Sequence, residues 1–482
     1  MAVEKSFPDK YKNFGEWYNE IVDRANLVDL RYGVKGFVVY RPVAMRIINR
    51  IYEVYERELQ ATGHEPCLFP VVIPRNAFKT EEEHIKGFGG EVFWVTKAGE
   101  RELEEPVLLR PTSETAMYPM YSLWIRSYKD LPLKLYQSCT VYRYETKATK
   151  PLLRGREFLW IEAHDAHRTE HDALQQVRED AKIAAKVLYE ELGLPFLHLQ
   201  REDFDKFPGA VETYAFEVLF PDKRMVQCGT THYLGTNFSK PFNIKYLDEK
   251  GASKYAYQTC YGPGISRIAA AVICVHGDDY GLVLPFESAP VEVVIVPIPM
   301  GDSTKKILAK CNELREKLEK AGLRVRLDDS DARPGEKFYK WELLGVPVRI
   351  EIGPKDLEKK VATIFRRDTR ERLAVKEADV VEHVLELEEK MLKYLRGRAE
   401  KFLKENMFKA KTKQELIKLT KEKGGIIRVN YCGSRECADY LKSETGGFEV
   451  RGKRIDIEEE PDGPCIWCGG EAERVVYLAK AY

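Results

Sequence analysis

The sequence has no long apolar run. No segment approaches the ~20 consecutive apolar residues that a membrane-spanning helix needs, and the mean hydropathy is −0.42. The first twelve residues carry Lys5, Lys10 and Lys12 but lack the apolar stretch of a secretory signal. We therefore expect a soluble, cytoplasmic protein with no membrane partner.

The chain has no net charge and few cysteines for its length. The 77 basic residues balance 77 acidic ones, which excludes a uniformly basic nucleic-acid coat but allows a local basic patch. Ten cysteines in 482 residues do not suggest a disulfide scaffold. Six of them are scattered and predicted to be small buried residues: Cys67, Cys139, Cys228, Cys260, Cys274 and Cys311. A chain of this length predicts about three domains.

The segment from Thr140 to His167 alternates charged residues with apolar ones. Residues 139–144 and 157–164 have the period of half-buried strands. The loop between them is basic and contains Lys147, Lys150, Arg154 and Arg156. A hairpin of this kind would hold several guanidinium groups over an apolar floor and fit a phosphate-sized anion. A salt-bridged surface hairpin is the alternative.

The N-terminal region predicts two helices and an edge strand. Apolar residues recur at helical spacing over 13–30 and again over 43–62, where Gly63 stands at the C-cap position. Residues 67–74 form an apolar strand, and Pro70 inside it predicts an edge position or contact with a partner. A dimer seam and an ordinary core helix with an edge strand fit these residues equally well.

Three later segments combine polar groups with regular structure. Thr112, Ser113 and Glu114 follow a strand and fit either a helix cap, which the spacing alone favours, or a site for a substrate ammonium group. A helix is expected over 169–193. A polar segment, 225–235, precedes a glycine turn and an apolar helix over 261–279, in which Arg267 needs an anion or an aromatic face.

The pattern of predicted secondary structure changes after Pro285. Strands and helices alternate, as in a small α/β domain with a mostly parallel sheet, and residues 286–290 form the expected linker. A helix over 377–406, whose charges predict a solvated face, leads to the final segment. Its two cysteine pairs, each beside glycine, suit a structural Zn²⁺ held by four thiolates: Cys432, Cys437, Cys465 and Cys468. Two inert thiol pairs are the alternative.

Several motifs together resemble those of the class II aminoacyl-tRNA synthetases. VYRYE, LLRGREF and GPGISR resemble motifs 2 and 3, and the helix that ends in CLFPVVIP resembles motif 1. RPTSET, FLWIEAH, CGTTHYLG and GVPVRIEIG narrow the resemblance to the prolyl-tRNA synthetase family, and the four cysteines resemble its archaeal and eukaryotic type. The resemblance covers nearly the whole chain.

The resemblance implies an α+β protein with three domains. It implies a class II antiparallel-sheet catalytic domain over 1–285, an α/β anticodon-binding domain with a connecting helix over 286–405, and a small α/β zinc-binding domain over 406–482. It also implies a homodimer that binds tRNA(Pro), L-proline and ATP, and no DNA. The expected activity is ATP-dependent ligation of proline to tRNA through a prolyl adenylate, with Mg²⁺ as cofactor.

The resemblance assigns roles residue by residue. Arg143 and Arg267 are the catalytic residues. The expected proline site consists of Thr112, Glu114, Arg143, Trp160, His164 and His232. The expected ATP site consists of Arg143, Glu145, Arg154, Phe158, Gln227, Thr230, Ser266 and Arg267, with Gln227 also a contact to Mg²⁺. The expected anticodon contacts are Glu342, Arg349, Lys355 and Asp356, for which a salt-bridged sheet edge is the alternative. A terminal carboxylate, here on Tyr482, is directed toward the active site in the family.

The chain departs from bacterial relatives in having no room for an editing insertion between Glu157 and Arg267. Because a pocket separates similar small substrates by only ~1–3 kcal/mol per methylene, we expect misactivation of cysteine or alanine. Two rival readings remain open. One is a class II paralogue with another substrate. The other is a non-catalytic RNA-binding scaffold, which would have no need for the phosphate-directed Arg143, Arg154 and Arg267.

Overall fold

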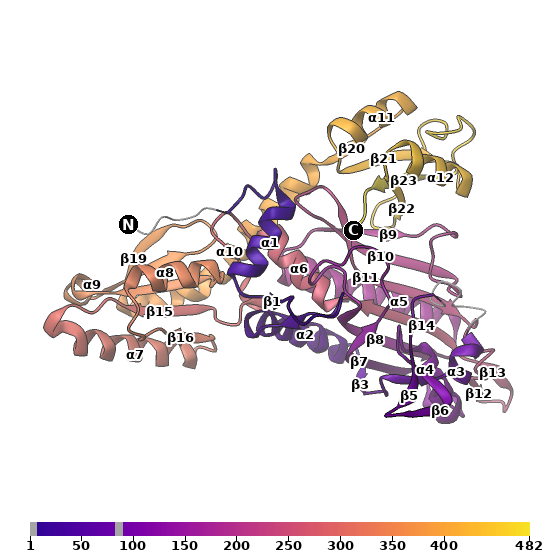
Figure 1. Cartoon of the computed structure of the whole chain (residues 1–482), viewed down its shortest axis with the longest axis horizontal. Helices are drawn as coiled ribbons and strands as arrows, with labels where there is room; N and C mark the ends of the chain where they lie inside the picture. The colour runs from indigo at the N-terminus through magenta and orange to yellow at the C-terminus, as the bar shows by residue number, and fades with distance from the viewer. Residues whose placement is uncertain (1–6, 82–89) are drawn as a thin grey trace.

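The computed structural model describes residues 7–81 and 90–482, and its centre is an antiparallel sheet (Figure 1). Within the part of this sheet formed by residues before Pro285, neighbouring strands are antiparallel except for the edge strand β3, which runs parallel to β7. The strands, in spatial order, are β9 (Phe196–Gln200), β10 (Glu212–Leu219), β11 (Met225–Gly235), β14 (Tyr257–Pro263), β8 (Glu157–His167), β7 (Leu133–Tyr142) and β3 (Glu65–Pro66).

The predicted hairpin is confirmed. β7 and β8 pair without interruption from Leu133 opposite Ala166 to Tyr142 opposite Glu157. Both strands are longer than predicted, and their buried residues place this hairpin inside the sheet rather than on the surface. The alternative of a salt-bridged surface hairpin is therefore wrong, because Val141 on β7 and Ile161, Glu162 and Ala163 on β8 are buried.

Helices pack against this sheet and against one another. They are α1 (Phe14–Arg24), α2 (Pro42–Ala61), α5 (Glu170–Ala184), its π-helical continuation η2 (Ala185–Glu191) and α6 (Ile265–His276). The helices expected before Gly63 and Gly193 end two residues before these glycines, but the helix expected over 13–30 is shorter and ends at Arg24, because residues 28–29 form a short strand instead. The Thr169 hydroxyl accepts a hydrogen bond from the Asp172 N–H at the start of α5. Gly63 and Gly193 have φ angles of +85° and +64° at the two C-terminal ends, a conformation that glycine adopts readily.

The single strand expected over 67–74 is wrong. The chain leaves the central sheet after β3, and β4 (Val72–Pro74) joins a separate sheet with β6 (Arg101–Leu109) and β5 (Phe93–Ala98). Pro70 lies at this break, where it has no N–H for a ladder, and the Phe69 N–H donates to Gln137 Oε1 at 3.0 Å instead. The predicted edge position is confirmed for β4, the part of the expected strand that forms, because it lies at one edge of this three-stranded sheet.

The small elements of this half of the chain complete the fold. They are β1 (Val28–Asp29), β2 (Val39–Tyr40), α3 (Arg75–Glu81), α4 (Glu114–Trp124), η1 (Tyr128–Asp130), β12 (Lys245–Leu247) and β13 (Ser253–Tyr255). Between β8 and α6 the chain forms only α5, η2 and strands, so no additional domain interrupts this described segment.

The α/β unit after Pro285 has a mixed sheet, so the expected mostly parallel sheet is wrong. β15 is parallel to β16 and β17, but β17, β18 and β19 are antiparallel. The connection from Ile352 to Val361 is too short for the crossover of a dozen or more residues that a parallel pair requires. The elements are β15 (Val293–Pro297), η4 (Gly301–Ser303), α7 (Thr304–Lys320), β16 (Val325–Leu327), α8 (Pro334–Leu343), β17 (Val348–Ile352), α9 (Pro354–Lys359), β18 (Val361–Arg366) and β19 (Arg372–Lys376).

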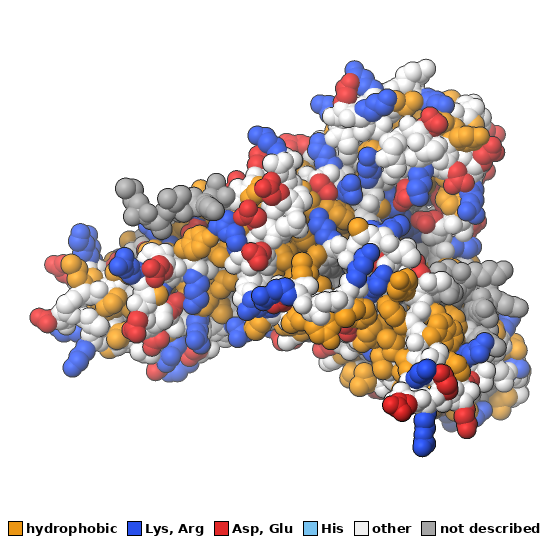
Figure 2. Space-filling model, in the orientation of Figure 1, with side chains coloured by type: hydrophobic (Ala, Val, Ile, Leu, Met, Phe, Trp, Pro, Cys, Tyr) orange, Lys and Arg blue, Asp and Glu red, His pale blue; other side chains and the backbone are white. Residues whose placement is uncertain are grey.

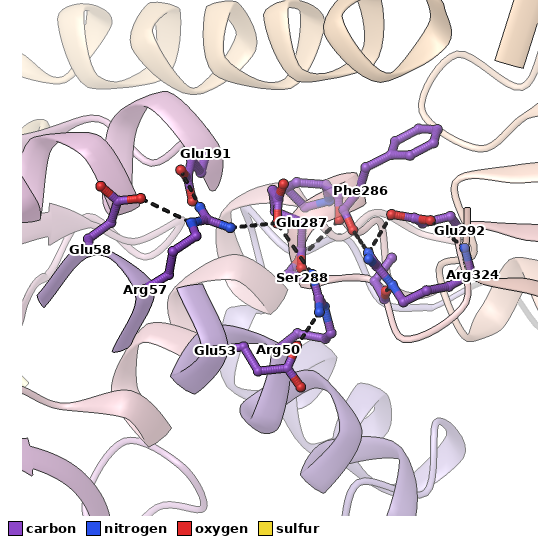
Figure 3. Close-up of polar contacts among 12 residues, drawn as sticks. Arg50, Glu53, Arg57, Glu58, Glu191, Phe286, Glu287, Ser288, Glu292 and Arg324 are labelled. Atoms are coloured by element: carbon purple, nitrogen blue, oxygen red, sulfur yellow. Dashed lines mark hydrogen bonds and ion pairs between the residues drawn. The ribbon is translucent and has the colours of Figure 1, made fainter. Parts of the chain in front are cut away.

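The linker η3 (Phe286–Ser288) is held from both sides by arginines (Figure 3). From α2, the Arg50 Nε donates to the Glu287 carbonyl at 3.1 Å, and its Nη2 lies 3.4 Å from the Glu287 carboxylate. From the α/β unit, the Arg324 Nη2 donates to the Phe286 carbonyl at 2.6 Å. Farther along α2, Arg57 pairs with Glu191 at 2.6 Å. The contacts of Arg50 and Arg324 with the linker connect the α/β unit to the domain that the resemblance expects over residues 1–285, called the catalytic unit below.

The C-terminal unit continues the central sheet. After η5 (Glu377–Asp379), the long helix α10 (Val380–Glu405) runs from the α/β unit to the C-terminal unit (Figure 1). It has one buried apolar face and a charged outer face, as predicted. Strand β22 pairs with β9, which gives one sheet of eleven strands within the described chain. The remaining elements are β20 (Met407–Lys409), α11 (Lys413–Glu422), β21 (Ile426–Tyr431), α12 (Arg435–Glu444), β22 (Glu449–Arg454) and β23 (Arg474–Ala479). Among the described helices, none is both long and apolar enough to cross a membrane.

Candidate active site

A cavity of about 520 Å³ opens on the central sheet and is lined by residues between Thr112 and Arg267 and by a few residues of the C-terminal unit. Strands β8 and β11, the loop between β7 and β8 and the first turn of α6 bring together residues that are far apart in sequence. Nine of the predicted substrate-binding residues line it: Thr112, Glu114, Arg143, Arg154, Trp160, Gln227, Thr230, His232 and Arg267.

Three guanidinium groups converge on this cavity. The Arg143 Nε donates to the Pro111 carbonyl at 3.0 Å, and the Arg267 Nε donates to the Leu153 carbonyl at 3.0 Å. Arg154 lies 3.6 Å from the Glu145 carboxylate. Burial, and then the positive charge of Arg143, lower the pKa of Arg267 to about 10, which leaves it charged at neutral pH. An anionic ligand would relieve this repulsion between neighbouring cations.

Thr112, Ser113 and Glu114 do not form the helix cap that the spacing alone favours. Ser113 occupies the N-cap position of α4 without a side-chain capping bond, and its hydroxyl donates instead to Glu162. The Thr112 hydroxyl lies 2.9 Å from Glu162 Oε1 and 2.5 Å from Glu114 Oε2. The Thr112 and Ser113 hydroxyls thus bind the buried carboxylate of Glu162, which is distant in sequence on β8, and do not cap the helix.

Two buried carboxylates therefore share the inner end of the cavity. Burial and then, among nearby groups, the Glu162 charge raise the pKa of Glu114, although His164 opposes them. Burial also disfavours the charged form of Glu162, but the hydrogen bonds and the charge of neighbouring groups, His164 first, lower its pKa overall. A cationic ligand next to Glu114 would restore its charged form. A substrate ammonium group has this chemistry.

Aromatic and imidazole groups form the apolar part of the wall. Trp160 packs so closely on β14 that a Cβ at Gly262 would lie 2.4 Å from its ring. The His232 Nδ1 is 2.9 Å from the Thr213 hydroxyl, and burial lowers the pKa of His232 to about 3, so its imidazole is neutral. His164 is fully buried behind the wall, with its Nδ1 3.1 Å from the Tyr118 hydroxyl.

Three further predicted residues lie beside this cavity rather than in its lining. Phe158 borders an adjoining hollow of about 370 Å³, which Arg154 also lines, and the Arg143 guanidinium lies 5.3 Å from the Phe158 ring centroid. Glu145 pairs with Arg154. Ser266 is buried in the first turn of α6.

Sequence reasoning missed several residues of the cavity. Glu162 was visible as a carboxylate in an otherwise apolar strand, but no role was assigned to it. Arg201 from the catalytic unit and Arg451 from the C-terminal unit also line the cavity, and no local pattern marks them. Tyr482 lines it too, as the resemblance predicted for the C-terminus, and its hydroxyl donates to Asp222 Oδ2 at 2.5 Å. Arg156, which had no assigned role, packs its guanidinium 4.0 Å from the Tyr144 ring centroid.

The predicted anticodon residues separate into two places. Glu342 and Arg349 line a second cavity, of about 550 Å³, together with aromatic residues of the α/β unit. The Arg349 guanidinium lies 4.1 Å from the Phe365 ring centroid and pairs with Glu351 at 2.8 Å. Asp356 instead caps α9, where its Oδ2 accepts from the Gly353 N–H at 2.8 Å, and neither it nor Lys355 lines this cavity.

The four C-terminal cysteines meet in space. Their Sγ atoms all lie within 4.8 Å of one another. A hydrogen bond from the Gly470 N–H, followed by the contact with Cys465, lowers the pKa of Cys468 to about 7. Gly433 and Gly469 have φ angles of +79° and +73°, which allows the tight turns of a cysteine knuckle. Four converging thiols in this arrangement fit tetrahedral Zn²⁺.

Comparison with known protein families agrees with this arrangement. Three family models match in order: "tRNA synthetase class II core domain (G, H, P, S and T)" over residues 93–276, "Anticodon binding domain" over 292–387, and "Prolyl-tRNA synthetase, C-terminal" over 414–482. They cover the central sheet, the α/β unit and the cysteine cluster, respectively.

Individual relatives match over the full chain. A proline–tRNA ligase of Thermofilum pendens is 51% identical and one of Thermococcus kodakarensis is 44% identical, each covering 100% of both chains. The structure of a Giardia lamblia prolyl-tRNA synthetase in complex with prolyl-adenylate matches with a TM-score of 0.95 and 38% identity, covering 99% of this chain and 100% of that one. The fold class expected from the sequence is thus confirmed, and the chain belongs to the prolyl-tRNA synthetase family.

Proposed function

We propose that this chain ligates L-proline to tRNA(Pro) in two steps. The proline carboxylate attacks the α-phosphorus of ATP, which forms prolyl adenylate and releases pyrophosphate. The terminal adenosine hydroxyl of the tRNA then attacks the prolyl carbonyl and releases AMP. The observation that carries this proposal is the convergence of three arginines and a buried Thr112–Glu114 pair on one cavity.

The arginines supply the electrostatic part of the mechanism. Arg143 bridges the proline carboxylate and the α-phosphate, and Arg267 with Arg154 holds the outer phosphates or the adenine. Arg143 and Arg267 are held by backbone carbonyls before the substrates bind, and Arg154 is held by Glu145. They therefore stabilise the charge that develops at phosphorus without reorganising. Phe158, Glu145 and Ser266 complete the nucleotide side from just outside the cavity lining.

The proline site uses the inner end of the cavity. Glu114 and the Thr112 hydroxyl receive the secondary ammonium, and Trp160 and His232 contact the ring. The neutral imidazole of His232 suits an apolar ring. His164 supports this wall from behind through Glu162, which lies 3.9 Å from its Nε2.

Mg²⁺ would be held next to the phosphates by the Thr230 hydroxyl and by the side-chain oxygen of Gln227, which uses one lone pair for the Arg201 Nη2 at 2.9 Å and keeps the other for the ion. When bound, it would neutralise phosphate charge.

Proline-dependent exchange of pyrophosphate into ATP tests the activation step. We expect exchange with proline, and we expect Glu114→Gln to raise the KM for proline by about tenfold or more, because a hydrogen bond to a charged group contributes ~1.5–3 kcal/mol. Glu157→Gln makes the same chemical change at a glutamate that does not line the cavity, so it serves as a control and should leave the KM for proline unchanged. Exchange without proline selectivity would remove the amino-acid assignment. No exchange with any amino acid would favour the scaffold reading.

We propose that the α/β unit reads the anticodon through Glu342, Arg349, Lys355 and Asp356. The cavity beside Arg349 combines a guanidinium with aromatic rings, which suits an unstacked base. Arg349→Ala should lower kcat/KM for tRNA by about 10–100-fold, the usual discrimination of one base contact. Proline activation should remain unchanged. Equal losses in both steps would indicate a folding defect rather than loss of a base contact.

We propose that Cys432, Cys437, Cys465 and Cys468 bind one structural Zn²⁺. The closed four-thiol geometry supports this assignment. Metal analysis of protein purified without chelators should give about one zinc per chain. A substoichiometric content that added zinc does not restore would contradict it.

We propose that the protein is a homodimer of the cytoplasm. On the face shown in Figure 2, apolar side chains gather over the catalytic unit near β7, β8 and α4. Large apolar side chains are exposed beside the β3 edge, including Leu68 at 78% and Leu123 at 55%, as at an interface. Light scattering at micromolar concentration should report a dimer, and Leu68→Glu should weaken it. A monomeric wild-type protein would contradict the proposal. Cell fractionation tests the location.

We also propose that the enzyme misactivates cysteine or alanine, because the described chain between β8 and α6 contains no editing domain. Pyrophosphate exchange should detect both amino acids. A preference for proline above ~10⁴-fold over both would contradict this expectation.

A further inference from the structure

One wall of the catalytic cavity consists of ionic side chains that two structural units contribute jointly. Arg201 follows β9, Glu217 lies on β10, and Arg451 comes from β22 of the C-terminal unit. Glu217 is fully buried, and both arginines are 8% exposed. Arg201 and Arg451 line the cavity together with Gln227. Charged groups this deeply buried are costly unless each one is held by partners.

Hydrogen bonds join the three side chains, and the Arg451 Nη1 also donates to Glu449 Oε2 at 3.2 Å. The Arg451 Nε donates to Glu217 Oε2 at 3.0 Å, and its Nη2 donates to Glu217 Oε1. The Arg201 Nη2 donates to the same Oε1, and its Nη1 donates to the Arg451 carbonyl at 2.8 Å. Because the Arg451–Glu217 contact is bidentate, it fixes the plane of the carboxylate and thereby the position of Arg201.

This set of hydrogen bonds ends on a residue of the proposed nucleotide site. The Arg201 Nη2 also donates to Gln227 Oε1 at 2.9 Å. An arginine has only donors, so the Gln227 atom that faces it must be the carbonyl oxygen. The amide nitrogen of Gln227 then remains as a hydrogen-bond donor for a ligand in the cavity. Such a donor suits an oxygen of a phosphate or a ribose.

The backbone of β22 is shaped to deliver Arg451 to this place. β22 pairs with β9 at Lys453 and Arg454, and its register toward β23 shifts between Val450 and Gly452. Gly452 has a φ angle of +125°, and a Cβ there would lie 2.1 Å from the Gln200 carbonyl oxygen. Only glycine permits this close approach, and a bulge of this kind redirects the neighbouring side chain.

We propose that Arg451 is a positioning residue for ATP. It holds Glu217, which orients Arg201, which in turn presents the Gln227 amide to the nucleotide. The C-terminal unit thereby takes part in nucleotide binding through a side chain. This inference rests on the proposed function, because it assumes that Gln227 contacts ATP. A merely structural ion cluster would instead support stability alone.

Steady-state pyrophosphate exchange separates these two roles. Arg451→Gln should raise the KM for ATP by about tenfold, the value of one weakened hydrogen bond, and change the KM for proline by less than about twofold. Arg451→Lys should restore part of the ATP affinity, because it keeps the charge but contacts only one Glu217 oxygen at a time. Arg454→Gln is the matched control, since it lies on the same strand and pairs with Asp456 at the surface. It should behave like the wild type.

A double mutant tests the route through Gln227. In a Gln227→Ala background, Arg451→Gln should change the KM for ATP by less than about twofold, because the residue through which it acts is already absent. An unchanged KM for ATP in the single variant, equal rises for ATP and proline, or a full additional effect in the double variant would overturn the proposal. If Arg451→Gln does not fold, Arg451→Lys is tested instead. It should raise the KM for ATP less than the glutamine variant is expected to, leave the KM for proline nearly unchanged, and have little effect in the Gln227→Ala background. A wild-type protein without proline-dependent exchange would instead remove the proposed function itself.

Discussion

We expect Glu162 to contribute strongly to the free energy of unfolding, although no pattern in the sequence marks it. It is fully buried, and its Oε1 accepts hydrogen bonds from the Thr112 hydroxyl at 2.9 Å and the Ser113 N–H at 3.0 Å. Its Oε2 accepts from the Ser113 hydroxyl and from the Gln137 Nε2, the latter at 3.4 Å. The variant Glu162→Gln keeps the shape of the side chain but removes its charge and replaces one acceptor by a donor.

The expected magnitude follows from these contacts. The two hydrogen bonds to Oε1 remain, but each loses its charge-assisted part, ~1 kcal/mol. The new NH2 group takes the place of Oε2, which accepted from Gln137, so that two donors face each other at a cost of another ~1 kcal/mol. We therefore expect Glu162→Gln to lower the free energy of unfolding by about 3 kcal/mol at pH 7. Thr112 would also lose its fixed orientation, so the KM for proline should rise.

Urea unfolding followed by circular dichroism measures the stability change. Glu157→Gln is the matched control, because Glu157 lies at the other end of β8, where it is partly exposed and accepts one hydrogen bond from the Tyr142 hydroxyl at 3.2 Å. It should change stability by less than about 1 kcal/mol. If Glu162→Gln were no more destabilising than Glu157→Gln, the reasoning from the buried hydrogen bonds would be refuted.

Three further predictions concern stability. Burial and then the Asp165 charge raise the pKa of Asp180 to about 7, so this carboxyl contributes stability that is present below its unfolded pKa and is lost as pH rises through about 7. The wild type should lose ~3 kcal/mol between pH 5 and 8 that Asp180→Asn does not lose, and parallel pH profiles would contradict this. Gly452→Ala should destabilise by several kcal/mol in thermal unfolding, because its Cβ would collide with the Gln200 carbonyl oxygen; a melting temperature equal to the wild type's would show that β22 can shift. Arg367→Ala should cost about 2–4 kcal/mol in urea, since Arg367 is fully buried and donates to both Asp278 oxygens at 2.7 and 2.6 Å; a change below ~1 kcal/mol would argue against this interdomain pair.

Local structure was largely predictable from the sequence. The β7–β8 hairpin and the ends of α2 and α5 follow from side-chain period and from capping residues that act within a few positions. The predictions that failed concern features that depend on contacts or connections beyond these few positions. Pro70 was recognised as unable to donate to a ladder, but whether the chain would then stay in one sheet or change to another depends on partners such as Gln137, far away in sequence. The sheet of the α/β unit was expected to be mostly parallel because helices alternate with strands, and the short connection after Ile352 decided otherwise.

The sequence by itself determined the fold class, the motifs and the residues that carry the charge for the proposed reaction, because these depend on residue type and spacing. Only the tertiary structure decided which of them meet. It brought Glu162 to the Thr112–Glu114 pair and displaced the expected cap. It also left Lys355 and Asp356 outside the cavity that Arg349 lines, and it placed Arg451 in the wall of a cavity built mainly by another unit. The reason is that a buried charge is stable only where distant parts of the chain supply its partners, and such long-range pairing leaves no periodic trace in the sequence.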